Sequence, residues 1–144
     1  MGYVMEIISI NDKQDLKKIF KETKTMAIVG LSPKPEKISN RVGKFLKEKG
    51  YKIIPIYPKE ERILGEKVYR SISEVNENID MVNVFRKSEF IPEIVEEILN
   101  REDIKTIWLQ LGIINNEAMK KAKEKGLNVV QDKCAMVEYN NIYK

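Results

Sequence analysis

The chain has 144 residues, a net charge of +4, one cysteine and no histidine, which corresponds to one domain with room for a substantial core. This composition excludes His-based catalytic pairs, phosphohistidine, His-ligated metal sites, an internal disulfide and a thiolate zinc cage. We expect a cytoplasmic protein that binds neither nucleic acid nor membranes, because Cys134 is a lone thiol, the charges are interspersed, and the sequence has neither a long apolar run nor a secretory signal.

Helix and strand patterns alternate along the chain. The first helix is predicted from Asn11, as its cap, to about Lys21, because Leu16, Ile19 and Phe20 then share one face. Short apolar strands are predicted over residues 26–30, 52–56, 81–85, 105–110 and 127–130. The other helices are expected to begin at Ser39, at Ser88 and at Asn115 or Asn116. A short helix is also expected to start at residues 71–74, where Ser71 and Glu74 have capping-box spacing.

This alternation predicts a Rossmann-like, doubly wound α/β domain with three layers and a five-stranded, mainly parallel sheet. Residues 1–25 are expected to form an N-terminal helical segment that packs on a domain spanning residues 26–144. Ligands of such sheets bind at the carboxyl ends of the strands, near the switch in strand order. The polar residues that directly follow each strand are therefore the candidates for a site.

The first candidate region follows the first strand of the domain. Gly30 and Ser32 lie in the turn after this strand, and Ser39, Asn40 and Arg41 open the next helix. Free amides and the helix dipole at such a helix start favour a pyrophosphate, and the arginine adds a positive charge. The alternative is an ordinary capped helix with a solvated arginine.

The second candidate region is Pro58-Lys59, directly after the second strand. NAD enzymes place an Asp or Glu near this position to bind the ribose hydroxyls. A lysine instead would pair with a phosphorylated ribose, which points to coenzyme A or NADP. The alternative is one more solvated surface lysine.

The remaining candidates follow the later strands. Arg86 either contacts a ligand or pairs with Glu89, whereas Phe85 is expected in the core. Gln110 and Gly112 either face the cavity or form an ordinary turn. Cys134 is by default a buried, inert thiol, although a CoA arm running along the strand ends could reach it and form a mixed disulfide under oxidation.

Six segments in order resemble a known family, namely residues 29–35, 41–42, 54–59, 80–86, 108–112 and 132–134. They are similar to the single-domain coenzyme A-binding proteins and to the CoA-binding N-terminal domain of the succinyl-CoA synthetase alpha subunit. The resemblance implies CoA as the ligand, bound across Gly30–Ser32, Pro58-Lys59, Phe85-Arg86 and Gln110–Gly112. The chain departs from the pattern at Ile38 and Ala135, where proline is usual.

The resemblance also bears on chemistry, because the synthetase's catalytic histidine belongs to a different domain and this chain contains no histidine. We therefore expect a small binding module for CoA or acyl-CoA without ligase chemistry of its own. The alternatives are a small NADP-dependent or acyl-CoA-handling enzyme and a regulatory subunit with an unidentified protein partner.

Overall fold

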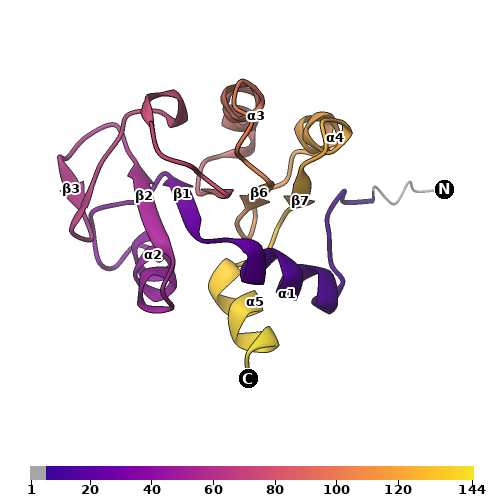
Figure 1. The fold of residues 1–144 in the computed structure, drawn as a ribbon, viewed down its shortest axis with the longest axis horizontal. Helices are drawn as coiled ribbons and strands as arrows, with labels where there is room; N and C mark the ends of the chain where they lie inside the picture. The colour runs from indigo at the N-terminus through magenta and orange to yellow at the C-terminus, as the bar shows by residue number, and fades with distance from the viewer. Residues whose placement is uncertain (1–5) are drawn as a thin grey trace.

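The computed structural model describes residues 6–144 and is built around a five-stranded sheet (Figure 1). All neighbouring strands are parallel, in the order β2-β1-β5-β6-β7. The strands are β1 Thr25–Val29, β2 Lys52–Ile56, β5 Met81–Val84, β6 Thr106–Leu109 and β7 Asn128–Val130. The predicted α/β class with a five-stranded parallel sheet is confirmed.

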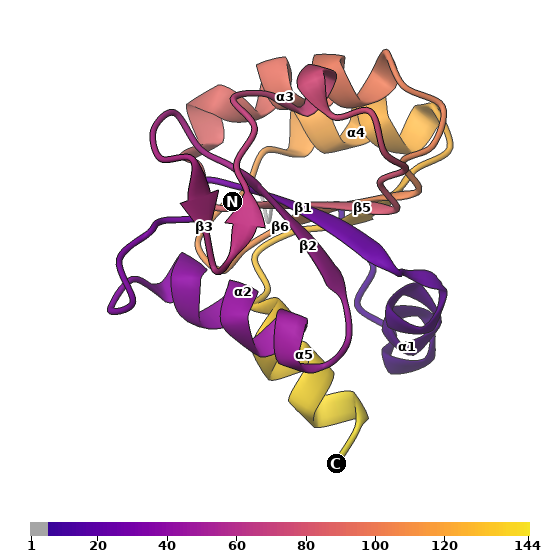
Figure 2. The ribbon, with the colours of Figure 1, turned by 60° about the vertical axis from the view of Figure 1, so that its left-hand side comes forward.

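Helices cover both faces of the sheet and complete three layers. They are α1 Lys13–Glu22, α2 Ile38–Glu48, α3 Ile91–Leu99, α4 Asn116–Glu124 and α5 Ala135–Ile142. Figure 2 shows α3 and α4 on one face and α1, α2 and α5 on the other. Each face has its own buried apolar cluster, which explains the nearly continuous apolar strands. Within residues 6–144, no helix combines the length and apolar character required to cross a bilayer.

The strand order places a topological switch between β1 and β5. The chain moves from β1 to β2 on one side and later returns to β5 on the other side of β1, so the connections diverge and leave a crevice at the carboxyl ends. Gly30 lies at this point with φ +84°, and a Cβ there would meet the Phe85 carbonyl oxygen at 2.7 Å. Glycine is therefore required for the close approach of the β1 and β5 ends.

The segment after β2 forms a small hairpin for which the sequence patterns predicted no element. Its strands, β3 Arg62–Ile63 and β4 Glu66–Lys67, pair antiparallel. Beyond the hairpin, Tyr69 forms a parallel bridge with Ile56 at the end of β2. This return brings Arg70 next to the residues that follow β2.

Several predicted helix starts need correction. Asp12, rather than Asn11, caps α1, because its carboxylate accepts from the backbone N–H groups of Gln14 and Asp15 at 2.9 and 3.2 Å. α2 begins at Ile38 with Lys37 as its N-cap, one residue before the predicted start, and Ser39 is already inside the helix. Asn115, one of the two predicted caps, does cap α4.

The two serine caps are also not formed as predicted. Residues 71–74 contain a 3-10 turn, η1 Ile72–Glu74; the Ser71 side chain makes no capping bond, and the Glu74 carboxylate accepts from Arg70 N rather than from Ser71 N. A second 3-10 turn, η2 Ser88–Phe90, precedes α3, and the Ser88 hydroxyl donates to the Ile114 carbonyl. At Ser88 a tertiary partner has replaced the local capping bond, whereas at Ser71 the predicted capping bond is not formed.

The N-terminal segment packs on the rest of the molecule. Leu16, Ile19 and Phe20 are buried, as the helical pattern predicted. Ahead of α1, Ile10 N donates to the Val129 carbonyl at 2.9 Å, alongside β7. The segment thus protects an edge strand from pairing with other chains.

Candidate functional site

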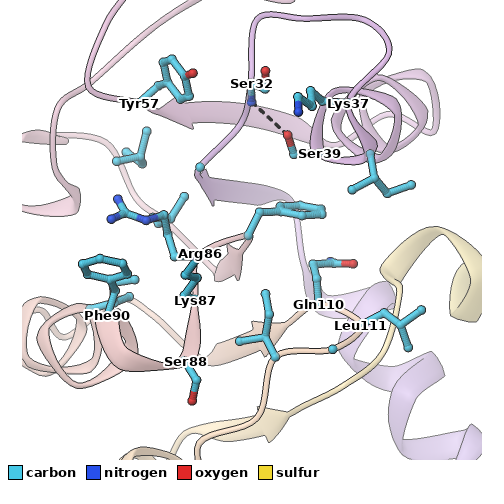
Figure 3. A pocket seen from close by; sticks show the side chains of 18 of the residues that line it. Ser32, Lys37, Ser39, Tyr57, Arg86, Lys87, Ser88, Phe90, Gln110 and Leu111 are labelled. Carbon is cyan, nitrogen blue, oxygen red and sulfur yellow. Dashed lines mark hydrogen bonds between the residues drawn. The ribbon is translucent and has the colours of Figure 1, made fainter.

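A cavity of about 1190 Å³ lies at the carboxyl ends of the strands, at the switch point (Figure 3). Nine of the twelve residues proposed from sequence line it: Gly30, Ser32, Ser39, Pro58, Phe85, Arg86, Gln110, Gly112 and Cys134. Asn40, Arg41 and Lys59 are not among its lining residues. Parallel strands bring their carboxyl ends to one edge, which is why residues so far apart in the chain meet here.

One wall is the loop between β1 and α2. Ser32 N donates to the Ser39 hydroxyl oxygen at 3.0 Å, the bond drawn in Figure 3, and Asn40 Nδ2 donates to the Ser32 carbonyl at 2.8 Å. Asn40 is buried and therefore shapes the loop from behind. Arg41 is exposed, whereas Lys37 lines the cavity at the start of α2, where the helix dipole adds to its positive charge.

A second wall follows β2. Tyr57 and Pro58 line the cavity, whereas the Lys59 side chain is exposed and lies outside the lining. Arg70 lines the cavity in its place and donates through Nη1 to the carbonyls of Tyr57, Lys59 and Glu60, at 3.0, 2.9 and 2.8 Å. This arginine was missed because it follows the hairpin rather than a predicted strand.

A third wall follows β5. Phe85 is half-buried and borders the cavity rather than lying fully within the core. The guanidinium carbon of Arg86 lies 4.2 Å from the centroid of the Phe90 ring, and Figure 3 shows the two side chains together. Across residues 6–144, the structure gives Arg86 no ion pair, so the alternative pairing with Glu89 is not formed. Stacking on an aromatic ring leaves the guanidinium N–H edge available.

The fourth wall, after β6 and β7, is held by internal hydrogen bonds. Gln110 is buried; its Nε2 donates to Asn83 Oδ1, and its Oε1 accepts from Ala135 N at 3.3 Å. Gly112 N donates to the Asp132 carboxylate at 2.7 Å. The amide of Gln110 is therefore engaged in joining β5, β6 and α5.

Cys134 lies where this wall meets α5. It is half-buried and lines the cavity, in contrast to the buried thiol expected by default. Leu111 and Val137, which are 71% and 50% exposed, line the same region. Exposed apolar side chains beside a cavity provide a surface for an apolar part of a ligand.

The charges around the cavity favour an anion. Lys37, Arg70, Arg86 and Lys87 line it, against two carboxylates, Glu93 and Glu97, on α3. The Glu97 carboxylate already has a partner within the protein, because its Oε1 accepts a hydrogen bond from the Ser73 hydroxyl at 3.0 Å. Of the four cationic residues, Arg86 and Lys87 directly follow a predicted strand and were candidates from sequence, whereas Lys37 and Arg70 were not. The arrangement can hold a polyanion beside an apolar extension.

Comparisons with known proteins identify the family. A family model described as "CoA binding domain" matches residues 24–140. The chain is 41% identical over 127 residues to the uncharacterized protein YneT of Bacillus subtilis strain 168, across 88% of this chain and 93% of that protein. A solved structure, a hypothetical protein from Pyrococcus horikoshii OT3, superposes with a TM-score of 0.90 at 36% identity, covering 99% of this chain and 100% of that one.

A longer relative carries the same kind of domain. The chain is 39% identical over 80 residues to the alpha subunit of acetate–CoA ligase (ADP-forming) I of Pyrococcus furiosus. This match covers 51% of the chain and only 17% of the ligase subunit. The expectation of a small, single-domain relative of CoA-binding ligase domains is confirmed, and the chain belongs to the CoA-binding domain family.

Proposed function

We propose that this protein is a binding module for coenzyme A or an acyl-CoA. The observation that carries the proposal is the cavity at the β1/β5 switch point, with four cationic residues and an apolar end. CoA has the same division, with phosphates at one end and a flexible apolar arm at the other. Membership of the CoA-binding domain family supports this ligand.

The ligand is proposed to cross the cavity along the strand ends. Its pyrophosphate lies near Gly30 and Ser32, where Lys37 and the start of α2 offer positive charge. The adenosine end lies beside Tyr57 and Pro58, which directly follow β2, because residues at the end of the second strand bind the ribose in folds of this kind. In this arrangement Asn40 supports the loop, and Arg41 and Lys59 contribute charge from outside the lining.

The pantetheine arm is proposed to run past Phe85 and Arg86 towards Gly112 and Cys134. Leu111 and Val137 then offer apolar contact to an acyl group on the ligand sulfur. We propose no ligase chemistry for the chain, which aligns with only 17% of the ligase subunit. Any chemistry on the bound ligand would then be supplied by a separate protein partner.

Calorimetry with CoA, acetyl-CoA, dephospho-CoA, NAD and NADP tests the proposal. We expect CoA or acetyl-CoA to bind more tightly than either dinucleotide. An Arg after β2 also suits the ribose phosphate of NADP, so NADP-dependent enzyme activity is the competing function. Tight NADP binding without CoA binding, or robust NADPH oxidation on a substrate panel, would overturn the assignment.

A further inference from the structure

Arg70 is an arginine held in place at the end of the cavity where the proposed function puts the ribose. Its Nη1 donates to three backbone carbonyls, those of Tyr57, Lys59 and Glu60, within 3.0 Å. The three acceptors belong to the turn that directly follows β2. The guanidinium is thus fixed beside the position that binds ribose in folds of this kind.

The other donors of this guanidinium are not used by the protein. Throughout residues 6–144, Nε and Nη2 of Arg70 have no hydrogen-bond acceptor, and Arg70 takes part in no ion pair. The three carbonyls are dipoles and do not neutralise the charge. A fixed, un-neutralised guanidinium with a free edge is suited to a phosphate, because its N–H groups match phosphate oxygens in pairs.

Lys59 is less suited to the same task. Its side chain is exposed and does not line the cavity, while its backbone carbonyl accepts from Arg70. An exposed lysine loses conformational entropy when it orders on a ligand, whereas the guanidinium of Arg70 is already oriented by the three carbonyls. The two side chains therefore differ in preorganisation although they lie at the same end of the cavity.

We infer that Arg70, rather than Lys59, binds the phosphate on the ligand ribose and so distinguishes CoA from dephospho-CoA. This inference rests on the proposed function and adds the residue that sets its specificity. Adenosine 3′,5′-bisphosphate should likewise be preferred over adenosine 5′-monophosphate, because the extra phosphate alone separates these two compounds.

The test measures affinities of CoA and dephospho-CoA for the wild type and for Arg70→Gln, Lys59→Gln and Arg62→Gln. Arg62 is the matched control, since it is an exposed arginine of the hairpin whose Nη1 donates to the Gly65 carbonyl and which does not line the cavity. For an exposed, charge-assisted contact we expect Arg70→Gln to reduce the CoA preference about tenfold. Lys59→Gln and Arg62→Gln should leave the preference nearly unchanged.

Each other result has a definite meaning. If Lys59→Gln abolishes the preference and Arg70→Gln preserves it, the inference is wrong. If Arg70→Gln weakens both ligands equally, the arginine only supports the turn, and the inference is also wrong. If the wild type binds neither ligand, the proposed function fails and the inference with it. In wild-type protein, adenosine 3′,5′-bisphosphate should shift the Arg70 Nε–H NMR signal more than the monophosphate does, and equal shifts would count against direct contact.

Discussion

Two arginines in this fold hold three backbone carbonyls each, yet their surroundings differ. Arg101 donates to the carbonyls of Ile72, Val75 and Glu77 and also pairs with Asp103, its Nη2 lying 2.7 Å from the carboxylate. Arg70 holds an equivalent set at the cavity, and within residues 6–144 no carboxylate pairs with it. The charge of Arg101 is therefore neutralised within the fold, whereas the charge of Arg70 remains available to a ligand.

Burial reinforces the difference. The side chains of Arg101 and Asp103 are 17% and 20% exposed, so their ion pair stands largely out of water. Arg70 is an exposed residue at the edge of the cavity. Losing a partner costs more where water cannot replace it. The Arg101 region should therefore govern stability, and the Arg70 region should govern ligand specificity.

The largest expected effect is the loss of Arg101. Arg101→Ala leaves the Asp103 carboxylate and three carbonyls without their donor, so we expect unfolding free energy to fall by about 3–4 kcal/mol. Arg70→Ala is the matched variant, with an expected loss below about 1 kcal/mol, because water can reach the released carbonyls. Urea unfolding of the two variants measures these losses of unfolding free energy. Equal losses would show that the two arginines do not differ in their contribution to stability.

The next effect concerns the backbone on which the cavity is built. Gly30→Ala should lower the unfolding free energy by about 2–3 kcal/mol, because φ is unfavourable for alanine and the Cβ meets the Phe85 carbonyl at 2.7 Å. Gly50→Ala is the control, since Gly50 also has positive φ but a Cβ there meets nothing within 4 Å; about 1–2 kcal/mol is expected. Identical losses in chemical denaturation would show that the β1–β5 contact adds nothing.

A third prediction sharpens the stabilising role of the Arg101 region. Hydrogen bonding from Arg101 lowers the pKa of the Asp103 carboxyl below its ordinary value, and the bond from Ile79 N acts in the same direction. The ion pair therefore stabilises the fold above the unfolded pKa, near about 4, and is lost as pH falls through the lower folded pKa.

Asp103→Asn measures that contribution. We expect the variant to be about 1–2 kcal/mol less stable than the wild type near pH 7. The difference should be nearly constant down to about pH 5 and should shrink at lower pH, where the wild-type carboxyl also becomes neutral. Unfolding curves across pH 2–7 provide the measurement, and a difference that grows on acidification would contradict the assigned direction of the pKa change.

The smallest effect on stability is expected at Cys134, whose labelling rate reports on ligand binding instead. Because the thiol is half-buried and lines the cavity, maleimide should label it in the free protein. Acetyl-CoA at about ten times its dissociation constant should slow labelling about tenfold by occupancy alone, and it carries no competing free thiol. Cys134→Ser should give no labelling, and an unchanged rate in protein saturated with acetyl-CoA would remove Cys134 from the proposed path.

Much of the site could be predicted because parallel strands bring every post-strand residue to one edge. That rule found Gly30, Pro58, Arg86 and Gln110 on the cavity lining. It could not distinguish a side chain facing the cavity from one facing solvent, which is why Lys59 was proposed. Arg70 was missed because a hairpin and a single bridge, both set by tertiary pairing, return it to the end of β2.

The sequence by itself determined the layered α/β fold, because apolar strands alternating with amphipathic helices can be buried in few other ways. It also placed Gly30 in the turn after β1, whereas the close approach of this turn to Phe85, where only glycine fits without strain, is a contact between distant segments. Tertiary structure alone decided the formation of α5, whose first residue is anchored by Gln110, and the bond from the Ser88 hydroxyl to the Ile114 carbonyl. It likewise decided which arginine is neutralised, because ion pairs and cavities depend on distances between segments that local patterns do not encode.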